Sequence, residues 1–456
     1  MIAREIERWL RLNSRRRGRP LGVVLHTGCL NYDMEQLRKI AQTGSWLILP
    51  DNVFWEIELL KGSKTVYGTK ARKLLEMSEN ICRVGWDLEQ LYLPKLGGMI
   101  RSDLYDGPML FLFGDLNKQD EFLKQVCPME HCHILLHTDW ELGDRPVICE
   151  LNSVRGCSYR EAVGLSKSVD LPALSRITRI RCLCSGNVRT ISGRDFVKTD
   201  MYGSYSRLYT HNAYPGRYFK VYKQKAQTDT SARKLRELMQ YARKKPIAFA
   251  AFPEALLVTG DDMILGCGIP IRQGQPLRIY CERRWKGKTP EQVASILREL
   301  LTALLELHLH GILVNDLTSN NILISGNDMV HFVDCDSMQF KCYPGGAITE
   351  LYRHPKINRG TELLELRYPL HEYFALAVLL FQCYVSGDPL YGENANWTNS
   401  KFLFGENLNN RADVNEALWE NWMELPAVLR RMFSDVFLQR RDYSIGAWCR
   451  GLSEQE

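Results

Sequence analysis

The chain has 456 residues, of which 45% are hydrophobic and 25% are charged, and its formal net charge is +6. This is the composition of an ordinary soluble globular protein with two to three domains. No run of about 18 apolar residues occurs, the N-terminus lacks the apolar stretch of a secretory signal, and none of the fourteen cysteines forms a CxxC pair. We therefore expect a cytoplasmic protein with reduced thiols and no membrane association.

Residues 1–155 are expected to form an α/β domain. Short apolar runs that read as buried strands alternate there with helical patterns; they are VVLH (23–26), SWLILP (45–50), MLFLF (109–113) and HILLHT (133–138). Strands separated by helices predict a parallel sheet. A polar stretch, residues 156–189, follows and is expected to be a linker.

The pattern changes after residue 190. Residues 190–275 contain short strand-like runs, such as RYFKVYK (217–223), and one helical pattern, SARKLRELMQYARKK. They predict a small, mostly antiparallel sheet with one helix. Residues 276–456 are mainly helical. A strand-rich lobe followed by a helical lobe, an α+β arrangement, predicts a cleft between the two.

Two helices of the last region are well marked. The first begins at Thr289, which can cap it, with Pro290 in the first turn and Gln292 able to close a capping box. The second, HEYFALAVLLFQCYVSG (371–387), is apolar nearly all round and is expected to end at Gly387. Such a helix is buried on every side.

Three polar residues at fixed offsets stand between apolar runs. In HGILVNDLTSNNILI (310–324) Asp316 lies on a loop and Asn321 opens a strand, and Asp334 follows the next strand in VHFVDCDS. A hairpin of this length brings Asn321 and Asp334 together. One amide and one carboxylate oxygen suit Mg²⁺ that carries phosphates, and Asp316 can then orient an attacking hydroxyl or accept its proton.

This order resembles the catalytic and metal-binding loops of protein kinases, HRDxxxxN followed by DFG. The resemblance covers about residues 190–456. FKVYK resembles the strand that carries the phosphate-binding lysine, here Lys220, and SARKLRELM resembles the next helix, with Glu237 as the expected partner of Lys220. EYFALAVLLFQCYVSGDPLYG and RRDYSIGAW are similar to two later helices. FKVYK, NDLTSNNILI and VDCDSMQ resemble the motifs of the bacterial kinase group that accompanies helix-hairpin-helix DNA-binding and stress or phage-defence proteins.

The resemblance implies an ATP- and Mg²⁺-dependent serine/threonine protein kinase acting on a protein substrate. Lys220 and Glu237 would hold the nucleotide's phosphates, Asn321 and Asp334 would hold Mg²⁺, and Asp316 would be the catalytic base. A nucleotide-binding pseudokinase scaffold is the first alternative.

Several positions depart from the kinase pattern. In YGSYSRLY only Gly203 matches the glycine-rich loop, with Met201 and Ser206 at the other two glycines. Val314 and Asn315 replace His-Arg before Asp316, so no basic pocket for a loop phosphate is expected. Lys220, Asp316, Asn321 and Asp334 are nevertheless all present, which favours an active enzyme.

The N-terminal region resembles PIN-type ribonuclease domains, which hold Mg²⁺ or Mn²⁺ with several carboxylates on a parallel sheet. Glu56 matches the second acid, and Asp120 and Asp139 are candidates for the later ones, but His26 stands in place of the first aspartate. The resemblance implies either a degenerate module that binds RNA or a partner, or a ribonuclease regulated by the kinase-like domain; a generic α/β recognition domain is the remaining alternative. The run SRRRGR (14–19) is either a nucleic-acid contact or a solvated arm.

Overall fold

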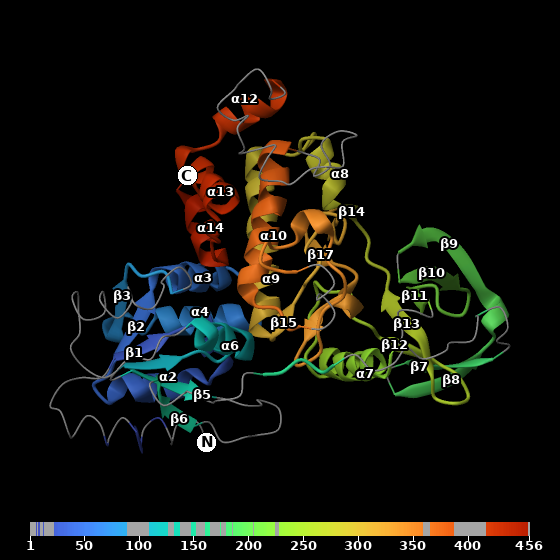
Figure 1. Ribbon diagram of the computed structural model, residues 1–456, viewed down its shortest axis with the longest axis horizontal. Coiled ribbons are helices and arrows are strands. Elements are labelled where there is room, and N and C mark those ends of the chain that lie inside the picture. Colours follow the sequence, from blue (N-terminus) through green and yellow to red (C-terminus); the bar gives the residue numbers. More distant parts are fainter. Residues whose placement is uncertain are drawn as a thin grey trace.

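A computed structural model shows an α/β protein with one mixed sheet and several antiparallel sheets (Figure 1). The structure describes Ile6, Arg8, Trp9, Leu12, Leu174 and residues 22–88, 109–125, 132–136, 147–151, 160–164, 179–184, 186–203, 205–223, 228–358, 365–386 and 416–454. Within this part of the chain no helix has the length and apolar character that a membrane crossing requires. Asp139, Gly387 and the run 14–19 lie outside the described residues.

The N-terminal sheet has the strand order β3-β2-β1-β4-β5-β6. Its strands are β1 (Gly22–Leu25), β2 (Trp46–Pro50), β3 (Ile81–Val84), β4 (Met109–Leu112), β5 (Cys132–Leu136) and β6 (Val147–Glu150). The first five are parallel and β6 pairs antiparallel with β5, so the predicted parallel sheet is confirmed with one antiparallel edge strand. The connecting helices are η1 (Thr27–Asn31), α2 (Met34–Gln42), α3 (Asp51–Lys61), α4 (Val66–Leu75) and α6 (Leu116–Gln125).

A second sheet of seven antiparallel strands lies at the opposite end of the molecule (Figure 1), in the order β8-β7-β12-β13-β11-β10-β9. Its strands are β7 (Ile180–Cys184), β8 (Asn187–Ile191), β9 (Phe196–Tyr202), β10 (Ser206–His211), β11 (Arg217–Tyr222), β12 (Ala255–Val258) and β13 (Ile264–Pro270). The sheet therefore begins before residue 190, inside the stretch expected to be a linker. Helix α7 (Asp229–Lys244) follows β11.

This second sheet must be strongly curved. Strands β8 and β9 form its two edges, yet only residues 192–195 separate them in the chain. So few residues span at most about 17 Å, whereas the edges of a flat seven-stranded sheet stand about 29 Å apart. The sheet therefore curls towards closure, with Phe219 buried on its inner side against Phe196.

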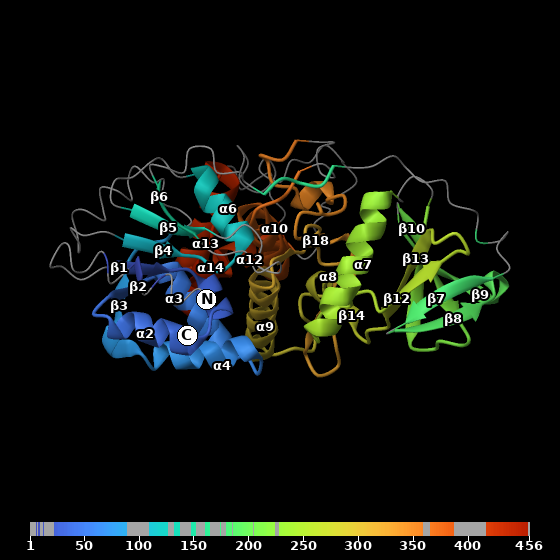
Figure 2. The ribbon, with the colours of Figure 1, turned by 90° about the horizontal axis from the view of Figure 1, so that it is seen from below.

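The helical part lies between the two sheets (Figures 1 and 2). Its elements are β14 (Gln275–Pro276), α8 (Leu277–Glu282), α9 (Pro290–Leu309), β15 (Ile312–Leu313), β16 (Ile322–Ile324), β17 (Val330–Phe332), β18 (Gln339–Phe340), α10 (Pro369–Phe381), a π-helical turn η9 (Gln382–Ser386), α12 (Glu416–Glu424), α13 (Ala427–Gln439) and α14 (Ile445–Ser453). The predicted capping box of α9 is confirmed, since Thr289 and Gln292 bond reciprocally. Helix α10 is buried along its length, as its sequence predicts.

The α/β domain is fused to the helical part by a continuous apolar core. Helix α3 packs against α14 and α9, and the same cluster of buried side chains contains Val53 and Ile57 of α3 and Trp448 of α14. Polar bonds cross the same interface. Glu306 of α9 accepts hydrogen bonds from the hydroxyls of Ser63 and Thr65, both at 2.7 Å. An interface with this apolar content is typical of a permanent association.

The contact between α3 and α14 depends on Gly446. A Cβ atom at this position would lie 2.0 Å from the Asn52 backbone oxygen and 3.0 Å from Glu56 Cγ. Asn52 O cannot retreat easily because it belongs to the backbone of α3. The glycine therefore sets how closely the two helices approach.

We expect Gly446→Ala to lower the free energy of unfolding by about 2 kcal/mol or more, the scale of overpacking a tight contact. Without the clash the same change would stabilise a helix by up to about 1 kcal/mol, so the sign of the effect is diagnostic. Urea denaturation measures it. Gly85→Ala is the matched control, since a Cβ there meets nothing within 4 Å; equal effects of the two changes would contradict the packing argument.

Candidate functional site

The Lys220 ammonium is the centre of the site. Lys220 lies on β11, is 8% exposed, and donates to the carboxylates of Asp334 and Asp336, the latter at 2.9 Å. Burial alone would lower the pKa of Lys220, but the two aspartates raise it above its ordinary value. The lysine is therefore a fixed positive charge between the curved sheet and the helical part.

Asp336 is the buried anchor of this lysine. It is 8% exposed, and its second oxygen accepts a hydrogen bond of 2.8 Å from the hydroxyl of Tyr222. Tyr222 lies two residues after Lys220 on β11, so both side chains point to the same face of the strand. The lysine and the tyrosine together hold one carboxylate.

Asp334 lies at the end of the predicted hairpin. Strands β16 and β17 pair antiparallel, and the Val333 amide donates to the Asn321 carbonyl at 2.9 Å. Asp334 adopts a left-handed conformation with φ 62°, which is uncommon outside glycine and turns the chain sharply. Although burial alone would raise the pKa of Asp334, the Lys220 ammonium brings it below its usual range.

Asp316 and Asn321 are joined by side-chain hydrogen bonds. The Asn321 amide nitrogen donates to Asp316 Oδ2 at 3.0 Å and to the Asp316 carbonyl at 2.9 Å, and the Thr349 amide donates to Asp316 Oδ1 at 2.8 Å. Burial raises the pKa of Asp316; these hydrogen bonds oppose that shift and the charge of Asp334 adds to it. Asp316, Asn321, Asp334 and Lys220 therefore converge on one region.

A buried glutamate of α10 fixes the loop before Asp316. Glu372 is 2% exposed and accepts hydrogen bonds from the Asn315 amide and from His308 Nε2, the latter at 2.8 Å. Asn315 has φ 70° and its side chain donates to the Gly346 carbonyl at 2.6 Å. The loop that precedes Asp316 is thus held in place by the hydrogen bonds of Asn315.

The expected pair between Lys220 and Glu237 is not formed. Among the residues that the structure describes, Glu237 accepts instead from Lys341 at 3.1 Å and from the Tyr343 hydroxyl at 2.6 Å, while Lys220 is held by Asp334 and Asp336. The charged side chain that α7 buries next to the turn of Asp334 and Asp336 is Lys234. The prediction for Glu237 is therefore corrected, because the turn after β17 supplies the lysine's partner and α7 does not.

Lys234 is 8% exposed and donates to the carbonyls of Ser337 at 3.3 Å and Pro344 at 2.9 Å. Burial lowers its pKa to about 8, and the charges of Asp336 and Asp334 only partly compensate. The sequence carries a signal for this placement. Thr230, Lys234 and Leu238 are spaced by four along α7 and share its buried face.

Gly203 lies in the turn between β9 and β10, where its amide donates to Ser206 O at 3.0 Å and Lys223 donates to its carbonyl at 2.8 Å. The turn is exposed at Gly203. Strand β10 pairs with β11 so that Leu208 faces Lys220. The turn therefore lies at one end of β10, the neighbour of the strand β11 that carries Lys220.

The oxygen atoms that remain suit a divalent cation. In the described part of the chain no three His, Cys, Asp or Glu side chains converge on a metal position. Asn321 directs its nitrogen to Asp316, so its oxygen points away, and Lys220 bonds Asp334 through Oδ1. One amide and one carboxylate oxygen are the small protein contribution that Mg²⁺ accepts when phosphates and water complete its shell.

The polar side chains of the α/β domain that could form a metal site are buried against the helical part. His26, Glu56, Asp115 and Asp120 are each at most 5% exposed. Thr27 bonds Glu56, and burial raises the pKa of Asp115 and raises that of Asp120 to about 6. Asp115, which directly precedes α6, was missed by the sequence analysis although it follows a predicted buried strand.

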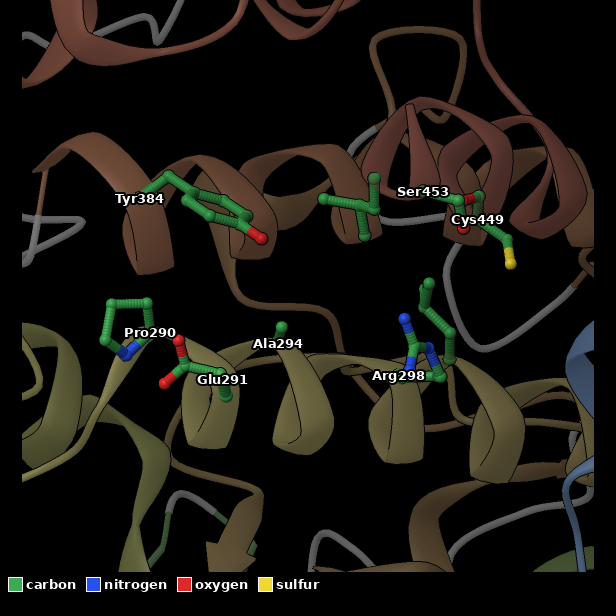
Figure 3. A pocket seen from close by; sticks show the side chains of 9 residues that line it. Pro290, Glu291, Ala294, Arg298, Tyr384, Cys449 and Ser453 are labelled. Atoms are coloured by element: carbon green, nitrogen blue, oxygen red, sulfur yellow. The ribbon is translucent and has the colours of Figure 1, made fainter. Parts of the chain in front are cut away.

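A cavity of about 290 Å³ lies between α9, η9 and α14 (Figure 3). Pro290, Glu291, Ala294 and Arg298 of α9 line one side, and Tyr384 of η9 faces them. Its lining residues do not include Lys220, Asp316, Asn321, Asp334 or Asp336. This cavity is therefore separate from the candidate site.

The lowered pKa of Lys234 predicts a pH dependence of stability. The folded protein loses the Lys234 proton near pH 8, whereas the unfolded chain retains it to about pH 10.4. Between these values the unfolded state binds more protons, so the free energy of unfolding gains up to about 1.4 kcal/mol per pH unit from this group as pH rises. Lys234→Met removes this gain.

Urea denaturation from about pH 7.5 to about pH 10 checks this expectation. The stability of the wild type relative to Lys234→Met rises across the range. Lys244→Met, at an exposed lysine of the same helix, gives a constant difference. A constant difference for Lys234→Met as well would show that Lys234 stays charged in the folded protein.

Comparison with known proteins gives no family: no protein-family model matches the chain, and no curated protein matches its sequence. The arrangement of side chains around Lys220 is therefore the ground on which a function can be proposed.

Proposed function

We propose that the chain is an ATP- and Mg²⁺-dependent protein kinase that transfers the γ-phosphoryl group to a Ser or Thr hydroxyl of a protein. The observation that carries this proposal is the convergence of Lys220, Asp334, Asn321 and Asp316, which come from two sheets and a loop. In this proposal the curved antiparallel sheet and the helical part are the two lobes of a kinase-like fold.

Each side chain has a role that follows from its surroundings. Lys220, held by Asp336, presents its ammonium to the α- and β-phosphates. Asn321 and Asp334 would hold Mg²⁺, which supplies charge neutralisation on the β- and γ-phosphates when it is bound.

Asp316 would orient the acceptor hydroxyl. As the hydroxyl oxygen bonds to the γ-phosphorus, the bond to the ADP oxygen breaks and Asp316 takes the hydroxyl proton. The burial that raises the pKa of Asp316 favours this role, since a carboxylate with a raised pKa is a better base. Most of the rate enhancement would come from positioning and charge neutralisation.

The test is transfer of label from [γ-³²P]ATP with Mg²⁺ to dephosphorylated casein and to the protein itself. We expect Asp316→Asn to lower the transfer rate by about 10²- to 10⁴-fold, the usual contribution of a general base, with nucleotide affinity nearly unchanged. Lys220→Met weakens nucleotide binding itself. Wild-type protein that binds Mg·ATP tightly and transfers no label would overturn the proposal and establish a pseudokinase.

The Glu237→Gln variant tests whether transfer depends on a pair between Lys220 and Glu237, as the kinase pattern implies. Glu237 bonds Lys341 in a partly exposed pair, and such pairs contribute little, so transfer by the variant stays within about threefold of wild type. Asp336→Asn, which removes the charge next to Lys220, lowers nucleotide affinity by about tenfold or more, since a charged hydrogen bond contributes about 1.5–3 kcal/mol. A larger loss in Glu237→Gln than in Asp336→Asn would reverse the assignment.

A further inference from the structure

Helix α7 is fixed to the segment that follows Asp334. Lys234 bonds the carbonyls of Ser337 and Pro344, and Glu237 bonds Lys341 and Tyr343. These contacts lie on successive turns of one helix. A displacement of α7 therefore displaces the turn that carries Asp334 and Asp336.

A short stretch of the connecting chain, residues 160–164, belongs to the same assembly. The Val163 amide donates to the Cys342 carbonyl at 2.8 Å, and the Thr230 hydroxyl donates to the Gly164 carbonyl at 3.0 Å. The stretch thus touches both partners, the segment after Asp334 and the first turn of α7. Figure 1 shows this blue-green stretch running from the α/β domain towards α7.

The other end of the stretch is anchored in the α/β domain. The Arg160 guanidinium donates to the Asn117 side chain and stands 3.6 Å from Asp120 Oδ2. Burial raises the pKa of Asp120 and the Arg160 charge opposes this shift, so the arginine favours the ionised carboxylate. Both Asn117 and Asp120 lie on α6.

Helix α6 is itself locked to the helical part. Lys118 is 5% exposed, donates to the hydroxyl of Tyr373 on α10, and stands 4.6 Å from the centre of its ring. Helix α6 therefore provides a fixed reference point for Arg160. From that point one unbroken set of bonds reaches α7 and the turn at Asp334.

We propose that Arg160 is a positioning residue for the phosphotransfer site: through residues 160–164 it lets the α/β domain set the position of α7 and of the turn that carries Asp334 and Asp336. This inference rests on the proposed function for its catalytic consequence, whereas its structural consequence does not. The N-terminal domain then acts as a built-in activator of the kinase-like part.

Hydrogen exchange of the full chain without nucleotide tests the structural consequence. We expect Arg160→Ala to raise exchange in residues 229–244 and 341–344 by roughly fivefold or more, through local opening, and to leave α3 and α9 unchanged. Arg160→Lys restores much of the protection. Arg38→Ala, at an exposed ion pair of α2, changes neither segment. If Arg160→Ala behaves as Arg38→Ala does, the proposal is wrong.

Thr230→Val removes the hydrogen bond between α7 and residues 160–164, the tether. It serves as a second variant in case Arg160→Ala has a general folding defect. It loosens residues 229–244 while Arg160 remains bound to α6. Normal protection in Thr230→Val, together with exchange raised throughout the chain in Arg160→Ala, would reduce Arg160 to a stabilising residue and overturn the inference.

Kinetics then separate this inference from the proposed function. With Mg·ATP and casein, Arg160→Ala raises KM for ATP and lowers kcat by about fivefold each, because both Lys220 and Asp334 shift, and Arg160→Lys recovers most of both. Wild-type protein that transfers no label, combined with local loosening in Arg160→Ala, removes the phosphotransfer role and keeps the tether. Unchanged kinetics and exchange in Arg160→Ala remove the tether and keep the kinase.

Discussion

The rest of the site depends on one buried ammonium between two carboxylates. A lysine that is 8% exposed would be neutral without compensation, and here Asp336 and Asp334 together supply more negative charge than Lys220 needs. Removal of either partner of such a buried group costs far more than the pair contributes. Because the aspartates lie on a turn of the helical part and the lysine lies on the curved sheet, this interaction fixes the relative position of the two.

Asp336 and Asp334 differ in how far solvent reaches their side chains, and their roles differ accordingly. Asp336 is nearly inaccessible and has Tyr222 as a second donor, so it serves as a permanent anchor. Asp334 is more open, with 37% of its side chain exposed, and it is the carboxylate of the pair that solvent can reach. In this arrangement α7 contributes a lysine, Lys234, in place of an acid. Among the residues that the structure describes, its ammonium bonds main-chain carbonyls and no carboxylate, which explains why burial dominates its pKa.

The sequence predicted the parts of the site that depend on local spacing. Asp316, Asn321 and Asp334 are set by one loop and one hairpin, which follow short-range rules. Lys220 was predicted from the resemblance of FKVYK to a kinase strand, and its contact with Asp334, 114 residues away in the chain, depends on tertiary packing. The partner of Lys220 is a choice between carboxylates that are distant in sequence, Glu237 and Asp336, and depends on the rotation of α7 about its axis. Spacing by four groups Lys234 with Thr230 and Leu238 on the buried face of that helix, whereas the kinase pattern pointed to Glu237. The close approach at Gly446 has no local signature.

In the α/β domain, acids near the carboxyl ends of the parallel strands are buried by packed helices. Acids that lie near the carboxyl ends of parallel strands are positioned to bind a metal and a phosphate, and Glu56, Asp115 and Asp120 fit that pattern. Metal-dependent cleavage requires ionised carboxylates that a phosphodiester can reach. Here helices α9, α10 and α14 pack against the elements that carry these acids, and the acids are almost fully buried. At this edge α6 is held against the helical part by Lys118 and Tyr373, and through Arg160 it also holds the neighbouring chain.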